Sequence, residues 1–151
     1  MKHYIIDGNN LIGKIKALNQ IHRKNKKQST EKLAFMIGRY FSNRKANVSL
    51  HFDGVQADVI KVAGIKIIYS GHVTADEKIK NEIGKSKNPK NIILITSDRN
   101  VAEFGRVCSC QLIKSEEFSK QLLSSGFSDE EKTKIDELDN PEEFKKLFGI
   151  K

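Results

Sequence analysis

Three aspartates of this chain each stand at the end of an apolar run that has the character of a β-strand. Asp7 ends the first such run, Asp53 ends the second, and Asp98 follows the strongest one. In an open parallel sheet, the carboxyl ends of the strands lie at one edge, where ligands bind. Asp76 and Glu77 lie in the expected first turn of a helix that begins near the same edge. We therefore expect up to five carboxylates to converge in one crevice.

Carboxylates crowded in this way raise one another's pKa and are costly unless a cation lies among them. Hard oxygen donors of this kind select Mg²⁺ or Mn²⁺. One or two such ions can polarise a phosphodiester and lower the pKa of a bound water, which then becomes the nucleophile. Asn10 lies three residues after Asp7, and its amide could orient a water or a carboxylate.

Each acid also has a purely structural explanation. Asp7 and Asp53 precede glycines and could end a strand in a turn. Asp76 and Glu77 suit the positive end of a helix, and Asp98 could cap one. These explanations are individually the commoner ones, but they do not account for the joint placement of all five acids at one edge.

Other chemistries lack their motifs. The first strand is not followed by a glycine-rich dinucleotide fingerprint, and the chain has no complete Gly-x-x-x-x-Gly-Lys-Ser/Thr phosphate loop. A phosphatase with an aspartate nucleophile would carry a second aspartate where Asn9 stands, and no serine nucleophile elbow is present. Cys108 and Cys110 are too close for an easy disulfide, and we expect them to be small residues on one face of a strand.

Positive charge is concentrated in the first third of the chain. The net charge of the 151 residues is +8, and residues 1–45 contain eleven basic and two acidic side chains. Such a face attracts polyphosphate, although a charge run can also be ordinary solvated surface. The basic residues that we expect to contact phosphates are Arg23, Lys24, Lys26, Lys27, Arg44, Lys45 and Arg99.

Strands and helices alternate along the sequence. Strands are expected over residues 3–6, 48–52, 65–69, 91–96 and 111–113, and helices over 10–20, from Ser29 or Thr30, from Thr74, over 100–107 and from Ser115. Continuous apolar strands between helices are typical of a parallel sheet that is covered on both faces. We expect one domain over residues 1–151, with C-terminal helices at 128–148 packed on it. The chain shows no membrane span and no signal peptide, which predicts a cytoplasmic protein.

Several ordered blocks resemble the YacP-like NYN domains of the PIN-like nuclease superfamily. The blocks are residues 5–11 (IIDGNNL), 52–53 (FD), 74–79 (TADEKI) and 95–99 (ITSDR), followed by 115–118 (SEEF) and 143–149 (EFKKLFG). The resemblance implies a three-layer α/β/α fold with a mostly parallel sheet of about five strands. It also implies a Mg²⁺- or Mn²⁺-dependent endoribonuclease, in some members acting in the context of translation.

The acidic positions of the family map onto Asp7, Asp76 and Asp98, with Asn10 as their polar partner. Asp53 and Glu77 match the family pattern less closely. The resemblance therefore predicts an endoribonuclease whose metal is held by the first three acids and whose substrate is RNA, including ribosome-associated mRNA. Two alternatives use the same residues: a non-catalytic RNA- or ribosome-binding adaptor, and a small-molecule phosphohydrolase, which would not need the basic third.

Overall fold

The computed structural model describes residues 1–55 and 60–124, and its centre is a parallel sheet of five strands in the order β3-β2-β1-β4-β5. The strands confirm the expected α/β class and lie within one or two residues of their expected positions. Their bounds are β1 Lys2–Asp7, β2 Ala46–Phe52, β3 Ile65–Tyr69, β4 Ile92–Ile95 and β5 Gln111–Ile113.

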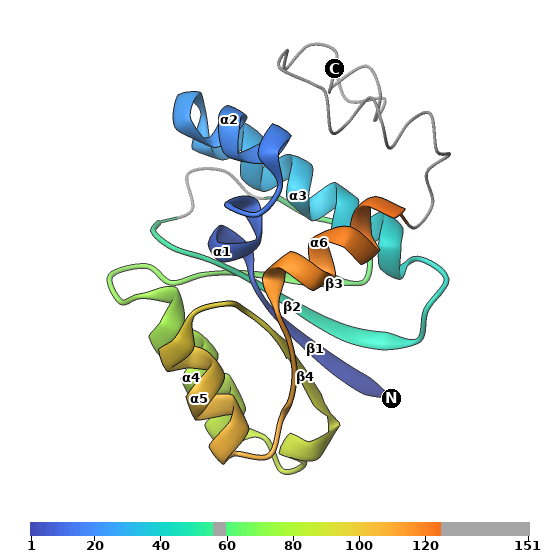
Figure 1. The fold of residues 1–151 in the computed structure, drawn as a ribbon, viewed down its shortest axis with the longest axis vertical. Coiled ribbons are helices and arrows are strands. Elements are labelled where there is room, and N and C mark those ends of the chain that lie inside the picture. Colours follow the sequence, from blue (N-terminus) through green and yellow to red (C-terminus); the bar gives the residue numbers. More distant parts are fainter. Residues whose placement is uncertain (56–59, 125–151) are drawn as a thin grey trace.

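Helices cover both faces of the sheet (Figure 1). One face carries α1 (Gly8–Ile12), α2 (Lys16–Lys24), α3 (Lys26–Phe41) and α6 (Ser115–Ser124). The other carries α4 (Ala75–Lys85) and α5 (Arg99–Val107), and a short 3₁₀ turn, η1 (Pro89–Asn91), precedes β4. The three-layer α/β/α architecture is therefore as predicted.

The alternation of side chains along β1 divides the core between these two layers. Ile6 packs with the helices of the first face, whereas Ile5 packs with Ile79 and Ile83 of α4. The chain builds the sheet outward from β1 in both directions, so the strand order reverses between β1 and β4. Open α/β sheets bind ligands in the crevice at the carboxyl ends of the strands on either side of such a reversal.

The helix expected over residues 10–20 is in fact two helices, α1 and α2, separated at Gly13. The apolar spacing that predicted one helix persists, because both pieces bury their apolar residues in the same cluster. The cap expected at Ser29 or Thr30 was also wrong. Asn25 caps α3, and the hydroxyls of Ser29 and Thr30 donate instead to backbone carbonyls within the helix.

The prediction that both cysteines lie on a strand was wrong. Cys108 ends α5 and Cys110 precedes β5, because Ser109 between them turns the chain with a φ of 72°. Cys110 is buried against the α4 and α5 layer.

The helices expected at residues 128–148 lie outside the described part of the chain. No helix in residues 1–55 and 60–124 is long and apolar enough to cross a membrane.

Candidate functional site

Asp7 ends β1 at the crevice, and only 5% of its surface is exposed. Thr96, which follows β4, donates its hydroxyl to Oδ2 of Asp7 at 3.0 Å. The same Thr96 oxygen accepts the backbone N–H of Asp98 at 3.1 Å. Thr96 therefore joins two of the predicted site aspartates across the point where the strand order reverses.

The four site aspartates lie within electrostatic reach of one another. Burial raises the pKa of Asp7 to about 6, and the charges of Asp76 and Asp53 add to the rise, although hydrogen bonds from Thr96 and from the Asn10 backbone oppose it. Burial and the charges of Asp98 and Asp53 likewise raise the pKa of Asp76, against the charge of Lys80. The structure thus brings together the aspartates that sequence analysis singled out.

Two of these aspartates also have structural roles. Oδ1 of Asp53 accepts the backbone N–H of Ala75 at 2.8 Å, at the start of α4. Oδ1 of Asp98 accepts the N–H of Val101 at 3.1 Å and caps α5. The capping explanation of Asp98 is therefore correct, and it holds together with a place at the site. Glu77 is exposed on the first turn of α4, and Asp53 is exposed as well, whereas Asp76 and Asp98 are half-buried and Asp7 is buried.

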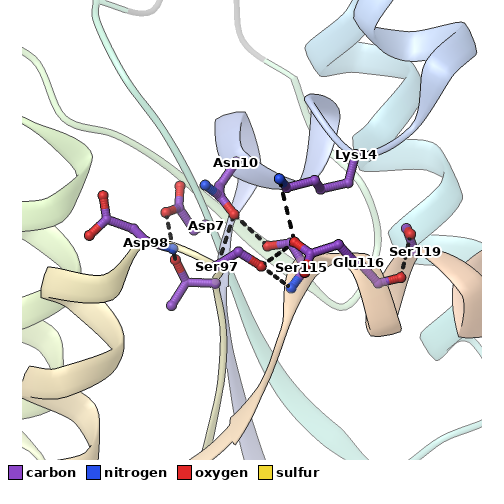
Figure 2. Close-up of polar contacts among 9 residues, drawn as sticks. Asp7, Asn10, Lys14, Ser97, Asp98, Ser115, Glu116 and Ser119 are labelled. Atoms are coloured by element: carbon purple, nitrogen blue, oxygen red, sulfur yellow. Dashed lines mark hydrogen bonds and ion pairs between the residues drawn. The ribbon is translucent and has the colours of Figure 1, made fainter.

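Asn10 is held by two donors on distant elements. Its Oδ1 accepts the backbone N–H of Ser97 at 2.9 Å and the hydroxyl of Ser115 at 2.6 Å (Figure 2). Because a backbone N–H can only donate, the oxygen of the amide must face these partners. The amide NH₂ is left to face the other way, which Figure 2 shows as the side of Asp7.

Sequence reasoning missed the residues that hold this arrangement. Ser97 donates to Glu116 at 2.5 Å and accepts from the Ser115 backbone at 2.9 Å, while Lys14 lies 3.5 Å from Glu116 (Figure 2). The hydrogen bond from Ser97 holds the pKa of Glu116 below its usual range. These contacts tie α1, the β4–α5 turn and α6 together. The sequence did contain a signal for these contacts, namely the two hydroxyl residues Thr96 and Ser97 between the strongest strand and Asp98.

The donor chemistry of the site fits a hard divalent cation, since its four aspartates offer carboxylate oxygens. As the side chains lie, no three histidine, cysteine or acidic groups in the described residues are arranged to hold one ion together. Asp53 and Asp98 each direct one oxygen to a helix N–H. Mg²⁺ commonly takes only one or two carboxylates and completes its shell with water. Asp7 and Asp76 are the two aspartates with the clearest electrostatic reason to bind a cation, because the pKa of each is raised.

The predicted phosphate-binding residues do not all lie on one surface. Lys26 and Lys27 line a pocket together with Asp53, and Arg99 is the first residue of α5, next to Asp98. Arg23 and Lys24 are exposed at the end of α2. Arg44 and Lys45, however, immediately precede β2 and so lie at the amino edge of the sheet, opposite the carboxylates. Arg44 there stacks on the Tyr40 ring, 3.9 Å from its centre.

The sequence profile of the YacP-like NYN domain matches residues 4–147. This chain belongs to that family. The family is one of PIN-like nucleases, which gives the chain a nuclease-type function related to RNA. Among the solved structures that share the fold are two of Rae1 (YacP) from Bacillus subtilis. The W164L mutant superposes with a TM-score of 0.69 at 19% identity and covers 82% of this chain and 76% of that one.

The second structure of Rae1 (YacP) has a TM-score of 0.63 at 22% identity, over 82% of this chain and 75% of that one. At these identities the likeness shows the fold alone. No match was found among curated proteins.

Proposed function

We propose that this protein is a Mg²⁺- or Mn²⁺-dependent endoribonuclease that cleaves RNA at the carboxyl edge of its sheet. The observation that carries the proposal is the burial of Asp7, which together with the charges of Asp76 and Asp53 raises the pKa of Asp7 to about 6. The charges of Asp98 and Asp53 act on Asp76 in the same direction. A protein gains nothing in stability from such repulsion, so perturbed acids in a crevice indicate a functional site. PIN-like nucleases generally use divalent metal ions, which supports the same reading.

In this proposal Asp7, Asp76 and Asp98 hold the ion, and Asp53 adds negative charge at the margin of the site. Glu77 is the weakest candidate ligand because it is not among the charges that act on Asp7 or on Asp76. A bound divalent ion would supply an activated water and stabilise the negative charge that develops on the phosphate. The Asn10 NH₂ is placed to donate to a phosphate oxygen or to a water. Arg99, Lys26 and Lys27 would neutralise flanking phosphates. The finer proposal is that mRNA, in the context of translation, is the substrate.

A second candidate is a non-catalytic RNA- or ribosome-binding adaptor. It is favoured by one observation: Asp53 and Asp98 cap the starts of α4 and α5, so these acids would be retained for folding alone. The two candidates differ in what they require of Asp76, which is half-buried and has a raised pKa. An adaptor has no use for that unfavourable charge.

The deciding experiment incubates the purified protein with mixed RNA in Mg²⁺, in Mn²⁺ and in EDTA, and compares Asp76→Asn with the wild type. The substitution keeps the shape of the side chain and relieves repulsion, so folding should be preserved. Cleavage should depend on metal and should fall at least about 100-fold in the variant. Glu103→Gln is the matched control, because it removes an exposed carboxylate from α5. Absence of metal-dependent cleavage by the wild type on any RNA, ribosome-bound message included, would favour the adaptor.

A further inference from the structure

A pocket of about 340 Å³ opens beside the carboxylate site, between the end of α2, the start of α3 and the carboxyl ends of β2 and β3. We propose that it binds one nucleotide of an RNA strand, with Lys26 and Lys27 on the phosphate and His22 on the ribose 2′-hydroxyl. This inference rests on the proposed function, since it places that nucleotide next to the phosphate at the carboxylates. The volume lies within the range of about 300–1,000 Å³ that is usual for small-ligand sites.

The pocket and the carboxylate site share a wall. Asn9 and Asp53 both line the pocket, and Oδ1 of Asn9 accepts the backbone N–H of Asp53 at 2.7 Å. Asp53 is also one of the charges that raise the pKa of Asp7 and of Asp76. A ligand in the pocket is therefore the immediate neighbour of whatever the aspartates hold.

The two lysines of the pocket stand at a helix start, where positive charge is disfavoured. Lys26 and Lys27 are the first two residues of α3, and no acid lies in its first turn. The first turn of a helix carries partial positive charge, which favours acids and disfavours lysines there. A local choice that opposes stability in this way indicates a functional demand. A phosphate between the two lysines would remove the conflict.

His22 presents a hydrogen-bond acceptor in the same pocket. Its Nδ1 lies 2.5 Å from the hydroxyl oxygen of Ser29, and that hydroxyl donates its one proton to the carbonyl of Lys26. Nδ1 must therefore donate to Ser29, which leaves Nε2 as the acceptor of a neutral ring. Burial, followed by the charge of Lys26, lowers the pKa of His22 and keeps the ring neutral near pH 7. An acceptor beside two phosphate donors suits a ribose hydroxyl, the group by which proteins tell RNA from DNA.

The remaining wall is apolar and suits a base. Val55, Ile60 and Tyr69 line it, and 69% of the surface of Val55 is exposed. The Tyr69 ring packs against Phe52, with 5.6 Å between the ring centres, so its orientation is fixed before a ligand arrives. Aromatic rings bind unstacked bases without strong sequence preference.

The test measures binding of a fluorescent RNA hexamer without uracil, and of the DNA hexamer of the same sequence, in EDTA so that metal-dependent cleavage is absent. The wild type should bind RNA about five-fold more tightly than DNA, as one ordinary hydrogen bond would produce. His22→Phe should abolish this ratio. Lys26→Gln with Lys27→Gln should weaken binding of both by roughly ten- to thirty-fold at 0.1 M salt and lower the salt slope by about 1.4.

The matched control removes two exposed lysines, Lys87 and Lys90, at the opposite edge of the sheet. If the α3 double variant binds like this control, or if the wild type does not prefer RNA, the pocket assignment is overturned. Because Lys26 and Lys27 are exposed, their replacement leaves the fold intact even if His22→Phe does not fold. Metal-dependent cleavage by the wild type without these binding effects would leave the nuclease standing and remove the pocket. The expected binding pattern without any cleavage would support the pocket and overturn the nuclease.

Discussion

Replacing Asp7 by asparagine should make the protein more stable and inactive at the same time. The Asp7 carboxylate is nearly fully buried and is surrounded by other acids, so its ionised form is unfavourable in the folded state. Asparagine has the same shape without the charge. It can still accept the hydroxyl of Thr96, so the connection to the β4–α5 turn is kept.

The size of the gain follows from the pKa. Folding raises the pKa of Asp7 from 3.8 to about 6, and each pH unit corresponds to about 1.4 kcal/mol, so ionisation costs the fold about 3 kcal/mol. An amide accepts one fewer hydrogen bond in this position than a carboxylate, at a cost of about 1 kcal/mol. The net gain of about 2 kcal/mol corresponds to a rise of roughly 4–8 °C in Tm for a chain of this length.

The pH dependence has a definite sign. Because the folded pKa lies above the unfolded one, wild-type Asp7 binds more protons in the folded state between about pH 4 and 6, and stability falls as the pH rises through this window. Asp7→Asn and the wild type should therefore be similar in Tm near pH 4 and should diverge up to about pH 6. The assay is thermal unfolding followed by circular dichroism in EDTA at pH 4.0, 5.0, 6.0 and 7.5, together with RNA cleavage in Mn²⁺.

Glu117→Gln, which removes an exposed acid from the first turn of α6, serves as the control and should show no such divergence. A variant that is less stable than the wild type at pH 7.5, or a difference in Tm that does not change with pH, would refute the reasoning. Either result would mean that the charge of Asp7 is already compensated within the fold and does not require a cation.

Two further predictions concern the neighbours of Asp7. A Cβ at Gly8 would lie 2.5 Å from the backbone oxygen of His51, so Gly8→Ala should lower the free energy of unfolding by about 1–3 kcal/mol and lower activity. Gly84 has open space around it, so the control Gly84→Ala should raise the free energy of unfolding by up to about 1 kcal/mol. Chemical denaturation measures both values, and equal effects would contradict the close contact at Gly8. Asn10→Asp keeps the oxygen that accepts from the β4–α5 turn but replaces the NH₂, so it should retain more stability than Asn10→Ala and still lose at least about ten-fold in cleavage rate. Full activity in Asn10→Asp would assign Asn10 a purely structural role.

Local information was sufficient for the fold class and for the convergence of the acids. The apolar runs of β1 and β4 are strong enough to predict strands, and parallel strands necessarily end at one edge. The same logic could have shown that Arg44 and Lys45, which precede a strand, lie at the opposite edge. It was not enough to find the break at Gly13, because α1 and α2 bury their residues in one cluster and the apolar spacing continues across the break.

What only the tertiary structure decided is the electrostatic state of the site and the direction of its side chains. Asp7 accepts a hydrogen bond from Thr96, which is 89 residues away, and Asn10 is oriented by partners 87 and 105 residues away. The pocket at His22 depends on α2, α3 and the ends of two strands at once. The sequence by itself determined which residues could do chemistry and at which edge, since hydrophobic period and strand polarity are local properties. Burial, pKa and hydrogen-bond direction are sums over neighbours brought from the whole chain, and they exist only once it has folded.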